Sequence, residues 1–286
     1  MKELITFKKQ RELGDVITDT FKFLRLEYKP LFKALLRNAA IPFLILIGIS
    51  AYYTGISTDF DMFSNDMFNA ANIILPLIGL FIAVFFYYGI LYGTVLNFIK
   101  LYIENQGIVD QDKLKVLVRQ DLGNLTGLTF LIAIMVFFGF MLCFFPGVYV
   151  AVPLSLTWAI LVFKNQSVGD SISDSFKLVK NEWWITFATM FVLGLLMYVA
   201  NLVFSLPAII YTVAKGFASA EQISQGDVSS MFDWVYVVLN VLSSAIQYIL
   251  AGVFAIAIAF IYFNLNEKKN QTGTFETIES IGSDND

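Results

Sequence analysis

Long runs of apolar residues alternate with short charged segments along this chain. Because only a helix satisfies its own backbone hydrogen bonds in lipid, a transmembrane segment needs about 20 mostly apolar residues. Six runs are candidates, at about 37–54, 71–99, 125–145, 147–163, 184–214 and 234–263. The pattern predicts an all-α integral membrane protein with six transmembrane helices.

Composition agrees with that class. Hydrophobic residues make up 57% of the 286 and charged residues 15%, whereas a soluble domain carries about 25% charged residues. The mean hydropathy is +0.70. These values exclude an ordinary soluble domain. The first 30 residues are charged throughout, so we expect no cleavable signal peptide.

One amphipathic phrase occurs twice. Residues 14–28 read GDVITDTFKFLRLEY and residues 169–183 read GDSISDSFKLVKNEW, with seven identities in fifteen positions. In each copy, apolar residues recur at three- and four-residue spacing, which predicts one apolar helix face. Ser167 and Asp170 have the spacing of a capping box. Both copies are too charged to span, so we expect helices lying in the cytoplasmic membrane interface.

A weaker echo suggests a third copy. NQGIVD at 105–110 resembles NQSVGD at 165–170. We therefore predict one polytopic domain, 1–266, made of three hairpin repeats, each an interfacial amphipathic helix followed by two spans. Residues 267–286 are polar and acidic at the end, and we expect a disordered cytoplasmic tail. The predicted repeat units are 11–104, 108–164 and 168–266.

Basic residues are sorted to one side of the predicted spans. Eighteen of the 19 Lys and Arg lie in segments on that side, and only Lys215 lies on the other. Since basic loops are retained in the cytoplasm, both termini should be cytoplasmic, in the inner membrane of the cell. The opposite loops carry carboxylates instead, which are Asp59, Asp61, Asp66, Glu221, Asp227 and Asp233.

The chain offers little catalytic chemistry. It contains no histidine and one cysteine, Cys143, which we interpret as an ordinary apolar helix residue. Histidine is the commonest general base and metal ligand, and the predicted spans lack the carboxylate that proton-coupled transporters use. We therefore expect no catalytic residue, no metal site and no cofactor.

Four polar side chains in the predicted spans are candidates for intramembrane polar contacts: Asn201, Gln247, Ser205 and Asn97. One interpretation is a hydrogen bond between neighbouring helices. The other is contact with a substrate or an ion. Trp183, Trp184 and Trp234 stand at span ends, where an aromatic belt anchors helices at the membrane interface.

Two short motifs predict local geometry. Pro146-Gly147 separates two apolar runs without a polar loop, which predicts a tight turn there. GILYG, at 89–93, has the small-xxx-small spacing of a close helix contact. That contact fits packing within one chain as well as it fits a dimer.

Residues 147–190 resemble a family. VPLSLTWAILVF, then NQSVGDSISDSFKLVKNEWW, then the next span is similar to the membrane domain attached to some glycerophosphodiester phosphodiesterases, and to its stand-alone bacterial relatives. The resemblance implies six spans and cytoplasmic termini. The catalytic domain of those enzymes uses histidine-rich metal chemistry, which this chain lacks, so hydrolase activity is not implied.

Three functions stay open. We favour a non-enzymatic membrane protein that acts as a structural or accessory subunit, packs against a membrane-protein partner or lipids and binds no nucleic acid. The alternative is a transporter or channel for a neutral or lipidic substrate. A membrane enzyme at the cytoplasmic interface ranks last, because the recurring carboxylates mark helix starts rather than one site.

Overall fold

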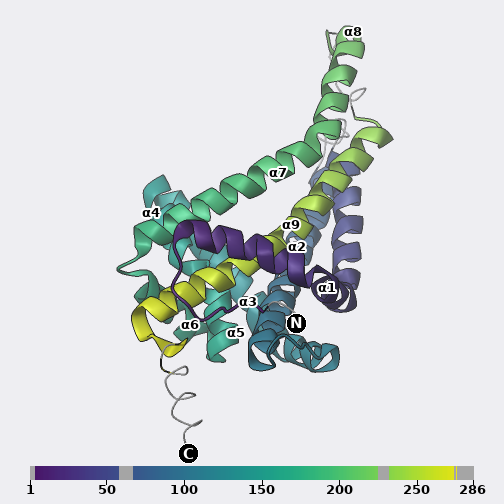
Figure 1. Ribbon diagram of the computed structural model, residues 1–286. Coiled ribbons are helices and arrows are strands. Elements are labelled where there is room, and N and C mark those ends of the chain that lie inside the picture. Colours follow the sequence, from purple (N-terminus) through teal and green to yellow (C-terminus); the bar gives the residue numbers. More distant parts are fainter. Residues whose placement is uncertain (1–3, 58–66, 225–231, 274, 276–286) are drawn as a thin grey trace, which may run out of the picture. The chain divides into compact units, whose positions relative to one another are not determined.

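The computed structural model describes residues 4–57, 67–224, 232–273 and 275, and the secondary structure of these residues is helical (Figure 1). Among them, six helical segments are long and apolar enough to cross a membrane, which confirms the predicted class. The helices are α1 (Leu13–Ser57), α2 (Met67–Glu104), α3 (Gln111–Leu142), α4 (Phe144–Leu154), α5 (Thr157–Lys164), α6 (Val168–Val179), α7 (Trp183–Ala218), α8 (Ala220–Ser224) and α9 (Trp234–Asn270).

The chain divides into two compact units. The first unit comprises 1–39, 88–194 and 252–286, and the second comprises 40–87 and 195–251. Four helices are divided between the units, with one part in each: α1, α2, α7 and α9.

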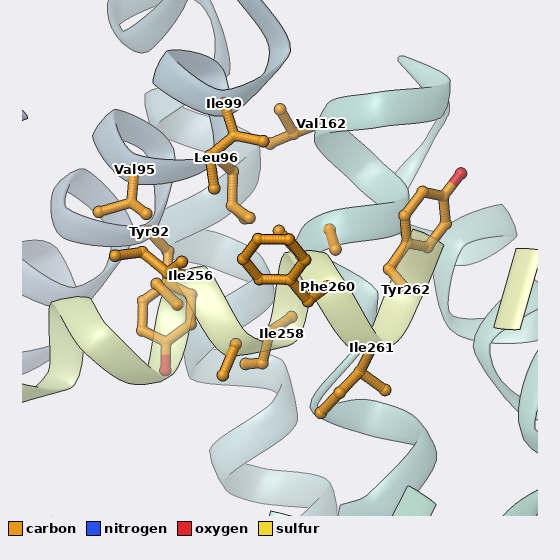
Figure 2. Packing of buried hydrophobic residues seen from close by; sticks show 14 of the residues in the cluster. Tyr92, Val95, Leu96, Ile99, Val162, Ile256, Ile258, Phe260, Ile261 and Tyr262 are labelled. Atoms are coloured by element: carbon orange, nitrogen blue, oxygen red, sulfur yellow. The ribbon is translucent and has the colours of Figure 1, made fainter. Parts of the chain in front are cut away.

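The core of the first unit surrounds the C-terminal half of α9. Residues 255–260 of that helix are completely buried. Figure 2 shows Ile256 and Phe260 of α9 among the apolar side chains of α2, which include Tyr92, Leu96 and Ile99. A helix that is apolar on all sides is a buried one, and this segment reads AIAIAF.

The segment before α1 is folded into this core. Phe7 is buried and stacks on Phe260 at a ring separation of 4.4 Å, and it meets Phe23 edge-on at 5.2 Å. Arg11 lies 4.7 Å from the Phe260 ring, and its backbone N–H donates to Asn264 over 2.7 Å. Phe7 and Arg11 are therefore part of the core of the first unit.

The two copies of the repeated phrase begin helices at matching positions. Helix α1 begins at Leu13 and α6 begins at Val168, which are 155 residues apart like the phrases themselves. Ion pairs also match: Lys9 pairs with Asp19 over 3.3 Å, and Lys164 pairs with Asp174 over 2.9 Å. The organisation into three repeats stays a prediction.

The sequence predicts an interfacial amphipathic helix before each hairpin, and two of these three segments are continuous with the span that follows them. Only the second copy of the phrase, in α6, is a helix of its own, ending at Val179 before α7 starts at Trp183. The first copy continues into the predicted span 37–54 as α1, and the 108–122 segment continues into 125–145 as α3. Asn181 stands at the break where α1 has Leu26, and asparagine has the lower helix propensity.

The turn between the third and fourth spans lies earlier than predicted. Cys143 has extended backbone angles and separates α3 from α4, so it is an exposed turn residue and not a helical one. Pro146 and Gly147 instead lie in the first turn of α4. Proline is tolerated at position 146 because an N–H there would have no helical partner. A Cβ on Gly139 would lie 3.0 Å from Cα of Gly147, so the two helices approach each other closely there.

The GILYG motif makes a close contact inside the first unit. A Cβ on Gly89 would lie 3.0 Å from Cα of Thr126, and one on Gly93 would lie 2.8 Å from a methyl carbon of Leu125. Both contacts are with α3. Packing within the chain therefore accounts for Gly89 and Gly93.

The predicted tail begins too early. Helix α9 continues to Asn270, and Glu267 is buried, where it accepts a hydrogen bond from the backbone N–H of Gly273. Residues 274 and 276–286 of the predicted disordered tail lie outside the described residues, as do Asp59, Asp61, Asp66 and Asp227 of the acidic loops.

Candidate functional site

Asn97 is placed by α2 in the interior of the first unit. Its side chain is fully buried, and its Nδ2 donates to Asp121 Oδ2 of α3 over 2.8 Å. This is the interhelical hydrogen bond that the sequence predicts as one alternative. Its Oδ1 is buried and accepts no hydrogen bond from the described residues.

Asn201 and Ser205 lie one turn apart on α7 in the second unit. Together with the buried Ala208 and with Thr212, they form one stripe of polar and small residues. Ser205 donates to Leu202 O over 3.0 Å, so its hydroxyl is satisfied within its own helix. The Oδ1 of Asn201 is buried and has no hydrogen-bond partner among the described residues.

Gln247 lies on α9, also in the second unit, and is exposed. It shares a helix face with three other polar residues, which are Asn240, Ser243 and Ser244. Each of those three donates to a backbone carbonyl of its own helix, to Tyr236, Leu239 and Asn240 respectively. Gln247 makes no such bond in the described part of the chain, and no hydrogen bond joins it to Asn201.

A polar cluster that sequence reasoning missed joins the ends of α7 and α9. Asp233 Oδ2 accepts from the Tyr211 hydroxyl over 2.5 Å and from Lys215 Nζ over 2.9 Å. Its Oδ1 accepts from the backbone N–H of Tyr236, which caps α9. The hydrogen bond from Tyr211 is the main cause that holds the pKa of Asp233 well below its usual range.

This cluster gives a charged partner to Lys215, the one basic residue in the predicted acidic loops. Lys215 occupies the last turn of α7 and is neutralised by Asp233. The sequence signal was the isolation of Lys215 among acidic loop residues, but nothing in its spacing pointed to Asp233.

The three tryptophans occupy helix starts, as anchors of an aromatic belt would. Trp183 and Trp184 begin α7, and Trp234 begins α9. Trp184 is 76% exposed and Trp234 is 75% exposed. Trp183 is partly covered, because its indole N–H donates to Tyr149 O over 3.2 Å and its ring stacks on Phe187.

The predicted polar residues do not converge on one point. In the part of the chain that the structure describes, no three metal-ligating side chains from His, Cys, Asp and Glu gather at one point. The predicted polar residues are divided between the units, since Asn97 belongs to the first and the other three to the second. Asn97 donates a hydrogen bond to another helix, and Ser205 donates one within its own helix.

Comparison with known proteins gives one result. A family model described as an uncharacterised protein family, UPF0259, matches residues 60–223. No curated protein and no solved structure matches the chain.

Proposed function

Since the chain belongs to the uncharacterised protein family UPF0259, whose description assigns no activity, we propose a function from its own residues. It is a non-enzymatic multi-pass protein of the cell inner membrane, with both termini in the cytoplasm. It serves as a structural or accessory subunit that packs against a membrane-protein partner. We also propose that residues 147–190 are similar to the membrane domain of some glycerophosphodiester phosphodiesterases. The description of the matched family makes no such link, so this similarity is a proposal only.

The observation that carries the proposal is the exposed amide of Gln247. It lies 13 residues after the interfacial Trp234, which is roughly 20 Å along a helix and close to the middle of a bilayer. A primary amide without a partner is costly in hydrocarbon, and a helix of another protein satisfies it with a hydrogen bond worth about 0.6–2 kcal/mol.

The surroundings of Gln247 support a protein partner on that side of α9. The exposed apolar residues Val238, Leu242 and Ile249 lie on the opposite face of the helix. That apolar face suits lipid tails. The face of Gln247 is polar along about two turns, and a polar face of this length suits contact with another helix.

Purification from native membranes tests the proposal. The chain carries a tag after Asp286, is extracted in mild detergent and is compared with Gln247→Leu and Ser243→Ala variants. Ser243 lies on the same helix face, but its hydroxyl is satisfied by Leu239 O. We expect a stoichiometric membrane protein to be retained by the unchanged chain and by Ser243→Ala, and to be lost from Gln247→Leu. Equal retention by the unchanged chain and both variants would refute the role of Gln247.

A second candidate function is transport of a neutral or lipidic substrate. The unpartnered, buried Oδ1 of Asn201 and the polar face of α9 favour it, since transporters hold substrates with neutral polar groups near mid-membrane. This function predicts that the purified chain carries no protein partner but retains one defined lipid or metabolite, which is lost in Asn201→Leu.

A further inference from the structure

Four lysines from two segments far apart in sequence meet at one cavity of the first unit. The cavity measures about 350 Å³ and lies between the end of α6 and the end of α9. Its lining includes Lys177 and Lys180 from one side and Lys268 and Lys269 from the other. Leu178, Asn181, Glu182 and Leu265 complete the wall.

Two described carboxylates pair with lysines of this cavity. Lys268 pairs with Glu182 over 2.7 Å, and Lys177 pairs with Asp174 over 3.2 Å. Lys269 donates to the backbone carbonyl of Lys177. This carbonyl is neutral, so the charge of Lys269 is not neutralised by it. Lys180 is exposed and forms no ion pair with a described residue. Of the described residues that line the cavity, four are lysines and one, Glu182, is a carboxylate, and this surplus of positive charge attracts an anion.

An apolar cavity of about 270 Å³ adjoins the first one and shares Lys177 and Lys180 with it. Its remaining wall is apolar and aromatic: Tyr149, Pro153, Phe176, Val179 and Trp183. Trp183 stacks on Tyr149 at a ring separation of 5.6 Å and donates its indole N–H to the Tyr149 carbonyl. The aromatic wall is thus held in place by α4 and α7 together.

We propose that the two cavities form one binding site for an anionic phospholipid. The lysine cavity takes the phosphate headgroup, and the aromatic cavity takes the start of an acyl chain. The occupant is a lipid rather than a free phosphate because the cationic and apolar walls are continuous through Lys177 and Lys180. The position agrees, since Trp183 begins a helix long and apolar enough to span the membrane. This proposal does not depend on a protein partner.

Tryptophan quenching tests the site. The full chain, purified in a non-ionic detergent, is titrated with phosphatidylglycerol carrying brominated chains, then with the matching phosphatidylcholine. We expect tighter binding of phosphatidylglycerol, and less quenching in Trp183→Phe. The double variant Lys180→Gln/Lys269→Gln should weaken binding by about fivefold for each lysine removed, because a basic side chain near a charged headgroup contributes about 1 kcal/mol.

A matched variant separates the site from general charge. Lys113→Gln/Arg119→Gln removes the same two charges from exposed positions on α3 of the same unit, and it should leave binding unchanged. Glycerol 3-phosphate should compete only weakly, because it lacks acyl chains. Three results would overturn the proposal: equal binding of the two lipids, equal weakening by both double variants, or competition by glycerol 3-phosphate at the concentration at which the lipid binds. Lys180 and Lys269 are both exposed, so their variants should keep the fold.

Discussion

Arg11 shows how one charged residue fixes a non-helical segment. Its side chain is fully buried, its Nε donates to Asp19 over 2.9 Å, and its guanidinium also donates to the backbone carbonyls of Phe7 and Thr6. Burial is the main cause that lowers the pKa of Arg11. A buried guanidinium is tolerated when its donors are satisfied, and here its donors hold the residues that enter the core.

Arg11→Leu should therefore destabilise the protein by about 3 kcal/mol, the cost of breaking a buried charged pair by removing one partner. Thermal unfolding in detergent measures the change. Arg119→Leu, at an exposed position on α3, should stay within about 0.5 kcal/mol of the unchanged chain. If both variants lose the same stability, the anchoring role of Arg11 is wrong.

Asp174 should give the stability a dependence on acid pH. Its carboxylate accepts hydrogen bonds from Lys164 and then from Lys177 and Gln166, and the bond from Lys164 is the main cause that lowers its pKa to about 2. A depressed pKa stabilises the folded state above the ordinary value of 3.8, and this contribution is lost as the pH falls toward about 2. Asp174→Asn should flatten the fall in unfolding temperature over that range. An unchanged slope would contradict the role of this carboxylate.

For single residues, the sequence predicted contacts between near neighbours in the chain but not contacts between distant residues. The Ser167 cap was predicted, and its Oγ accepts from the backbone N–H of Asp170 over 3.2 Å, because capping depends on three-residue spacing. The contact of Arg11 with Asn264 joins residues 253 positions apart. No pattern in one sequence specifies such a pair.

Helices α2 and α3 pack closely against each other at Gly89. The contact of Gly89 with α3 leaves no room for a side chain, since Cα of Thr126 stands 3.0 Å from the position that a Cβ on Gly89 would take. By contrast, a Cβ on Gly79, earlier in the same helix, would meet nothing within 4 Å. Close approach of helices through glycine is a common way to associate spans in membranes.

Gly89→Leu should accordingly destabilise the protein by about 1–3 kcal/mol through overpacking, while Gly79→Leu should have little effect. Unfolding temperatures of both variants in the same detergent give the comparison. Similar values for the two would show that α2 and α3 do not approach so closely.

The spans were predictable as elements because hydropathy reports burial in lipid or protein over about 20 residues. Helix continuity was not predictable in the same way. The phrase in α1 and its copy in α6 share a charge pattern, yet only α6 stops before its span. An Asn-Gln pair stands at the end of α2, of α5 and of α9. One residue of each pair has a left-handed backbone conformation: Gln106, Asn165 and Gln271. Two of these pairs stand out in the sequence only as a similarity between predicted repeats, with no sign that they end helices.

For the whole molecule, the sorted charges predict the orientation. A phosphatase reporter, active only outside the cytoplasm, should be inactive when fused after Asp286 and active when fused after Ser219. The physical reason is the cost of translocating basic segments. The opposite pattern of activity would invert the topology and would place the lysine cavity on the other side of the membrane.

The central claim is that Gln247 meets another membrane protein. Its most direct test is a photo-cross-linking amino acid at position 247 in intact cells, with position 242, exposed on the opposite apolar face of α9, as the control. We predict an adduct of one defined mass with a single protein from position 247 and none from position 242. Adducts with lipid alone at both positions would contradict the claim.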